Sequence, residues 1–175
     1  GNAIIHGLDE PLVVAAGVAS LVVIIGVWAL FFGPANEDHV LAPMTSEAHS
    51  DDPAANVSLA VLATNGQQVL VLGMVAFAVG AELVVAGPAE PVAPEAVMAL
   101  FGGIIICVTA FWFFLMRSTD RSMWVSLAVC DAVLICAAAV SVLAGLPGIA
   151  VIGLLVVVTV STAWGFNREA RLLAR

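Results

Sequence analysis

Lysine and tyrosine are both missing from this chain of 175 residues, and charged residues of either sign are scarce. Charged residues make up 10% of the sequence and hydrophobic residues 62%, with a mean hydropathy of +1.13. A soluble domain is usually about half apolar and about a quarter charged. The composition therefore excludes an ordinary globular domain, a disordered chain and a nucleic-acid-binding protein. It indicates an integral membrane protein whose main partner is the lipid bilayer.

The missing lysine also excludes several kinds of chemistry. Without it the chain cannot form a Schiff base with retinal or pyridoxal phosphate, and it cannot build a P-loop. The histidines His6, His39 and His49 all lie outside the apolar runs, so none can bind a haem within the bilayer. We therefore expect no cofactor.

The cysteines and histidines do not predict a metal site. Cys107, Cys130 and Cys136 lie inside apolar runs, where small thiols usually pack between helices. Cys130 and Cys136 would be about 9 Å apart along one helix, too far for a disulfide. No C-x-x-C pair is present. The spacing of His39 and His49 matches no metal-ligand pattern, and we expect their acidic surroundings to stay solvated.

Apolar runs bounded by charges, prolines and glycines divide the chain into five predicted transmembrane helices. Each reaches the ~20 residues needed to cross the hydrocarbon core. The predicted helices span residues 11–33, 66–86, 96–116, 122–144 and 148–167, and an interfacial lead-in, 57–65, precedes the second. An acidic loop, 34–56, follows the first helix, and a short basic tail, 168–175, continues the last as a helix. The predicted fold is an all-α, polytopic membrane bundle in one transmembrane domain, residues 1–175.

The arginines and tryptophans predict the orientation of this bundle. Five spans place the termini on opposite sides, and all the arginines share one side: Arg117, Arg121, Arg168, Arg171 and Arg175. Because basic loops stay in the cytoplasm, the C-terminus is predicted to be cytoplasmic and the N-terminus outside. The tryptophans fall at the same interface, as expected for interfacial anchors: Trp28, Trp112, Trp124 and Trp164. We expect a multi-pass protein of the plasma membrane.

One acidic residue, Asp131, lies deep in the predicted fourth span. It is about 13–15 Å from the cytoplasmic end of the helix, close to the bilayer midplane. An ionised carboxylate there costs several kcal/mol, so it must be protonated, partnered or hydrated, and such acids are candidate functional residues. The structural alternative is a hydrogen bond to a hydroxyl or backbone carbonyl of a neighbouring helix or subunit.

Other polar residues suggest a path for cations or protons. Glu82 lies in the outer half of the predicted second span, where it can also reach the outer interface as a simple interfacial residue. If the second and fourth spans are adjacent, Glu82 and Asp131 would be successive stations of this path. Its cytoplasmic mouth would be lined by Asn65, Gln67 and Gln68.

Small residues recur four positions apart in three of the predicted spans. The sets are Ala76 with Gly80, Ala128 with Ala132 and Cys136, and Ala137 with Ser141 and Gly145. Such stripes let helices approach closely in lipid, where van der Waals packing replaces the hydrophobic driving force. They predict packing within the chain, between copies of it, or against other membrane subunits.

These observations favour a non-catalytic membrane protein. No nucleophile–base arrangement, G-x-S-x-G motif or second deep aspartate is present, so we expect no enzyme activity. The first hypothesis is an accessory or structural subunit of a larger membrane complex. The second is a small homo-oligomeric ion or solute transporter or channel that uses Asp131 and Glu82. A weaker third is a sensor that acts through the acidic loop and the basic tail. The acidic, lysine-free loops suggest a prokaryotic source.

Overall fold

The computed structural model of the chain describes residues 10–32, 53–115 and 121–173, which form five α-helices. These helices are α2 (Pro11–Phe32), α5 (Pro53–Ala86), α6 (Pro94–Leu115), α7 (Arg121–Leu143) and α8 (Gly148–Leu173). Proline occupies the first position of α2, α5 and α6, where its fixed φ fits the helix and its missing N–H is not needed. Apart from one isolated bridge, the described residues contain no β-structure. The predicted all-helical fold is therefore confirmed for this part of the chain.

The helix bounds differ from the predicted spans mainly in α5. We expected a helix over 66–86 with a lead-in at 57–65, whereas one continuous helix begins at Pro53. The polar cluster 64–68 does not interrupt it, because Thr, Asn and Gln cost little helical propensity compared with proline. The predicted basic tail is helical as far as Leu173. The acidic loop lies outside the described residues up to position 52.

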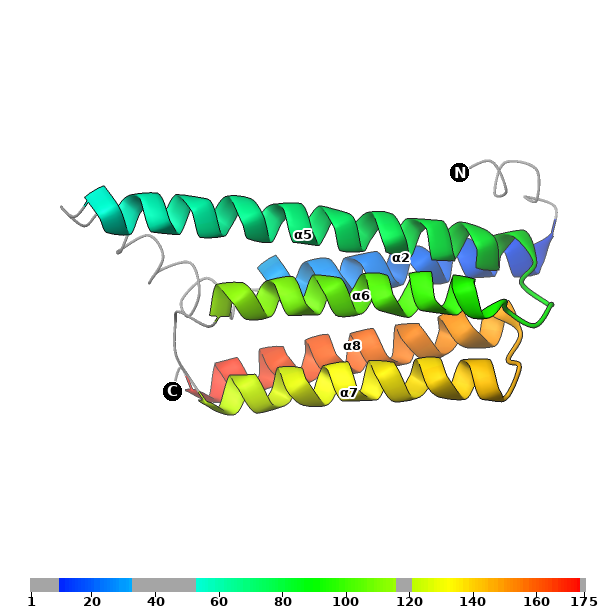
Figure 1. Cartoon of the computed structure of the whole chain (residues 1–175). Coiled ribbons are helices and arrows are strands. Elements are labelled where there is room, and N and C mark those ends of the chain that lie inside the picture. The colour runs from blue at the N-terminus through cyan, green and yellow to red at the C-terminus, as the bar shows by residue number, and fades with distance from the viewer. Residues whose placement is uncertain (1–9, 33–52, 116–120, 174–175) are drawn as a thin grey trace.

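The five helices lie alongside one another in an elongated bundle (Figure 1). Helix α6 packs on α5 and on α7, while α8 packs on α2 and α7. Helix α5 is the longest, and its N-terminal part extends beyond the ends of its neighbours (Figure 1). This arrangement leaves α5 and α7 on different sides of α6.

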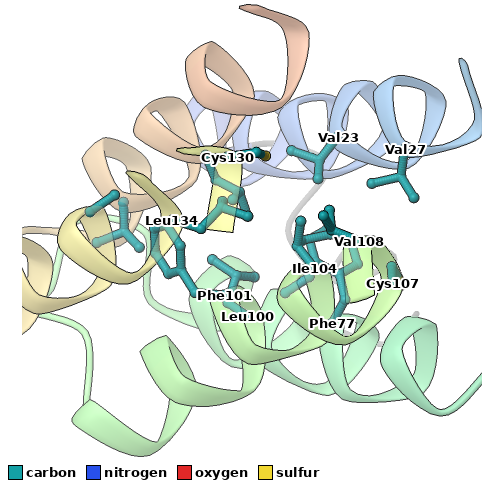
Figure 2. Close-up of a cluster of buried hydrophobic side chains, with 14 of the residues drawn as sticks. Val23, Val27, Phe77, Leu100, Phe101, Ile104, Cys107, Val108, Cys130 and Leu134 are labelled. Atoms are coloured by element: carbon teal, nitrogen blue, oxygen red, sulfur yellow. The ribbon is translucent and has the colours of Figure 1, made fainter. Parts of the chain in front are cut away.

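Apolar side chains from all five helices form the main core. Figure 2 shows Phe77 of α5 beside Leu100 and Ile104 of α6, with Val23 of α2 and Leu134 of α7 nearby. These side chains are buried inside the bundle, whereas many other large apolar side chains point outward. An outward-facing apolar surface is what a bundle immersed in hydrocarbon requires.

Glycines allow α5 and α6 to pack in close backbone contact. A Cβ built on Gly80 would lie 2.5 Å from the backbone nitrogen of Leu100, and one on Gly103 would lie 2.6 Å from the carbonyl oxygen of Gly73. The Sγ of Cys107 donates a weak hydrogen bond to the carbonyl oxygen of Leu70 across the same interface. Small residues therefore set the distance between these two helices.

The two turns at one end of the bundle are hydrogen-bonded to each other. The backbone N–H of Val92 donates to Leu146, and the N–H of Gly148 donates to Glu90, at 3.2 and 3.0 Å. Gly145, in the α7–α8 turn, has φ +57°, a left-handed conformation that favours glycine. The turns thus join the α5–α6 hairpin to the α7–α8 hairpin.

Three helices contain apolar segments long enough to cross a membrane. These segments are Pro11–Ala29 in α2, Thr64–Ala86 in α5 and Gly148–Gly165 in α8. Within the described residues, α6 and α7 contribute shorter apolar segments, Pro94–Ala110 and Ala128–Leu143.

Candidate functional site

Asp131 lies near the middle of α7, ten residues after its first residue, Arg121. At 1.5 Å per residue this is about 15 Å from that end of the helix. The residue is half-buried, and its Oδ1 is fully buried with no hydrogen-bond partner in the part of the chain that the structure describes. A buried polar atom without a partner loses its hydration and gains nothing in return, which makes Asp131 a candidate functional residue.

The residue before Asp131 connects α7 with α8. Cys130 is buried, and its thiol donates a 3.5 Å hydrogen bond to Oγ1 of Thr162. That hydroxyl in turn donates to the carbonyl oxygen of Val158, one turn earlier in α8, at 2.8 Å. The neighbouring polar groups are therefore engaged with each other, and the contact fixes α7 against α8 directly beside the acid.

A second unpartnered polar atom lies on α8. Thr159 is only 3% exposed, and its Oγ1 has no hydrogen-bond partner among the described residues. Ser20 and Ser141 both donate to the carbonyl oxygen four residues earlier, the usual solution for a hydroxyl in a membrane helix. The methyl group of Thr159 instead faces α2, where a Cβ on Gly26 would lie 2.8 Å from it. Gly26 thus makes room for Thr159.

The proposed path residues on α5 do not meet Asp131 within one chain. These residues all occupy exposed positions of α5: Asn65, Gln67, Gln68 and Glu82. Because α5 packs mainly on α6, and α7 packs on α6 and α8, the two helices are not packing neighbours over the described residues. The described residues of one chain therefore do not provide the adjacency on which a continuous path would depend.

The predicted anchors gather at one end of the bundle. The C-terminal ends of α2, α6 and α8 and the N-terminal end of α7 lie together in Figure 1, and each of these ends contains one tryptophan: Trp28, Trp112, Trp164 and Trp124. The side chains of Trp28 and Trp164 are exposed. The guanidinium of Arg168 lies 5.8 Å from the ring centroid of Trp164, within cation–π range.

The remaining anchors are the other arginines. Arg121 and Arg171 lie at the same end, in the first turn of α7 and the last turn of α8. Arg117 and Arg175 lie outside the described residues.

The three predicted small-residue stripes fall in different surroundings. Gly80 of the first stripe is packed against α6, and Ala137 and Ser141 of the third are buried in the bundle. In contrast, the whole second stripe is exposed on the outer side of α7: Ala128, Ala132 and Cys136. Close packing within the chain thus uses parts of two stripes and leaves this one on the surface.

The close contact between α5 and α6 also involves glycines that the four-residue spacing did not identify. Gly73 and Gly103 face each other between α5 and α6. A longer spacing was visible in the sequence, because glycine recurs every seven residues along α5 and its C-terminal end: Gly66, Gly73, Gly80 and Gly87. A seven-residue repeat keeps one face of a helix toward a partner, and it could have identified the α5 face that packs on α6.

In the part of the chain that the structure describes, no three His, Cys, Asp or Glu side chains come together in a group that could hold a metal ion. The histidines His6, His39 and His49 all lie outside it. Cys107, Cys130 and Cys136 are not disulfide-bonded.

The apolar helices and the outward-facing apolar side chains define an integral membrane protein with a helical bundle. The family model described as bacterial low temperature requirement A protein (LtrA) matches residues 3–163, which is most of the chain. The chain therefore belongs to the LtrA family of bacterial membrane proteins. Comparison with curated proteins and with solved structures gives no match.

Proposed function

We propose that the chain crosses the plasma membrane five times, with its N-terminus outside and its C-terminus in the cytoplasm. The gathering of helix ends that contain tryptophan and arginine at one end of the bundle supports this orientation. In this topology the hydrogen-bonded turns around Val92 and Leu146 lie outside. A single cysteine replacing Ala89 in a cysteine-free variant should react with an impermeant maleimide in intact cells. A single cysteine replacing Ser118 should react only after the membrane is opened.

Within the membrane, the chain acts as a non-catalytic accessory or structural subunit of a larger assembly. The observation that supports this role is the exposed stripe on α7, formed by Ala128, Ala132 and Cys136. Stripes of this kind let backbones approach closely, as Gly73 and Gly103 do inside this bundle. An exposed stripe at membrane depth is suited to the same contact with a helix of another subunit.

Gentle extraction of the tagged full chain from its native membranes tests this role. We expect native mass spectrometry to find the chain with a second polypeptide in a fixed ratio. A homo-oligomer or a monomer at every detergent and lipid concentration would contradict the subunit role.

Transport is a second candidate, supported by the unpartnered Oδ1 of Asp131 near the bilayer midplane. In this function the acid binds a proton or cation between copies of the chain, because one chain does not bring Glu82 next to it. Purified protein in liposomes should then move ions, and Asp131→Asn should abolish the flux. Equal flux from the parent protein and the variant would exclude this function.

The family description contributes a physiological expectation. We extend the low-temperature requirement in its name to this chain, so that deletion of the gene slows growth in the cold and leaves growth at the usual temperature unchanged. Equal growth of the deletion strain and its parent at both temperatures would contradict this extension.

A further inference from the structure

We propose that the outward face of α7 binds a transmembrane helix of a different polypeptide, and that this helix presents a basic side chain to Asp131. The proposal rests on the proposed subunit function and specifies the chemistry of the partner. The outward face is defined by five exposed residues: Ala128, Val129, Ala132, Ile135 and Cys136.

The first argument is the position of Asp131 relative to this face. The acid follows Ala128 by three residues and precedes Ile135 by four, so the three side chains are neighbours on the helix surface. Cys130 and Leu134 point into the bundle. Asp131 therefore lies at the border between the buried side of α7 and its outward face, and its half-buried state agrees with that border position.

The second argument is the cost of leaving this border uncovered. Part of the Asp131 side chain would contact hydrocarbon, while its Oδ1 is buried without a hydrogen bond. Both features are unfavourable for a carboxyl group in lipid. A helix packed on the outward face would cover the exposed part of the side chain and could pair with the part of the carboxyl group that is still accessible. The small side chains of Ala128 and Ala132 allow such a helix to approach closely.

The third argument is charge, and it distinguishes a different chain from a second copy. Acids within membranes pair with basic residues or with backbone groups. This chain has no lysine, and its arginines lie at positions 117, 121, 168, 171 and 175, away from the middle of the predicted spans. A second copy at the same depth would bring no basic side chain to Asp131. Charge complementarity therefore favours a partner helix with a Lys, Arg or His side chain near its middle.

Cross-linking identifies what covers the face. A photo-reactive benzoylphenylalanine in place of Ala128, in the full chain in native membranes, should cross-link to one peptide that mass spectrometry can sequence. We expect an apolar peptide from another polypeptide with a basic residue near its centre. Cross-links to this chain itself, to lipid alone, or to an apolar peptide without a basic residue would each overturn the proposal.

Substitutions at Asp131 test the charge pairing. Asp131→Asn should weaken recovery of the cross-linked partner about tenfold, the effect of losing one strong interhelical contact. Asp131→Glu keeps the charge and should retain most of the partner. If Asp131→Asn leaves the assembly intact, the charge pairing is wrong and the subunit function stands. If the parent chain is monomeric, both are wrong.

Discussion

Two adjacent glycines on α6 offer a sharp test of the α5–α6 contact. Gly102 and Gly103 sit on the same helix, so alanine at either position changes helix propensity in the same way. A Cβ on Gly102 would meet nothing within 4 Å. A Cβ on Gly103 would lie 2.6 Å from the carbonyl oxygen of Gly73 and 2.8 Å from the Cα of Phe77.

Of the two substitutions, only Gly103→Ala is expected to destabilise the chain. Normal carbon contacts begin near 3.4–4 Å, so Gly103→Ala must push the helices apart by about 1 Å. The obstructing atoms are backbone, and no rotation of a side chain relieves the contact. Overpacking of this kind costs about 1–3 kcal/mol. Gly102→Ala removes backbone freedom without a clash and should be neutral or stabilising by up to about 1 kcal/mol.

Reversible unfolding in mixed micelles, followed by circular dichroism as the SDS fraction rises, measures this difference. Gly103→Ala should unfold at a lower SDS fraction than the parent chain, and Gly102→Ala at the same or a higher one. Equal midpoints for the two variants would refute the close contact between α5 and α6.

Two further predictions use the same unfolding measurement. Gly145→Ala should destabilise the chain by about 1 kcal/mol because alanine disfavours the left-handed conformation at φ +57°. The control Gly153→Ala should not destabilise it, because a Cβ at Gly153 meets open space. Equal stabilities of the two variants would contradict the left-handed conformation of Gly145. Gly26→Ala should be destabilising because its Cβ would lie 2.8 Å from Cγ2 of Thr159. Combining Gly26→Ala with Thr159→Ser removes Cγ2 and should restore most of the lost stability. If the effects of the two substitutions on the free energy of unfolding are simply additive, the contact between Gly26 and Thr159 is contradicted.

The sequence was sufficient to predict the helices because local rules decide where they end. Pairs such as Gly87-Pro88 and the glycines around Pro147 interrupt apolar runs, and the observed helices end or begin at those places. The start of α5 was less predictable. The polar residues at 64–68 suggested an interface, but polarity alone does not break a helix, and α5 extends back to Pro53.

Helix neighbours could not be predicted in the same way. The sequence left open whether the helix of Glu82 lies next to that of Asp131, because an almost uniformly apolar helix does not show which face is buried. The hydrogen bonds between the turns, such as Val92 to Leu146, are likewise set by tertiary packing. Asp131 itself was identified from the sequence because a charge inside an apolar run is conspicuous. The lack of a partner for its Oδ1 became visible only in three dimensions.

The most direct test of the subunit function compares leucine at two exposed alanines. Ala132 lies in the outward face of α7, and Ala78 lies on the exposed side of α5, so both substitutions add the same bulk at membrane depth. Native mass spectrometry of the extracted assembly should show that Ala132→Leu releases the second polypeptide while Ala78→Leu retains it. Retention of the second polypeptide by both variants would contradict the role of α7 as the subunit interface.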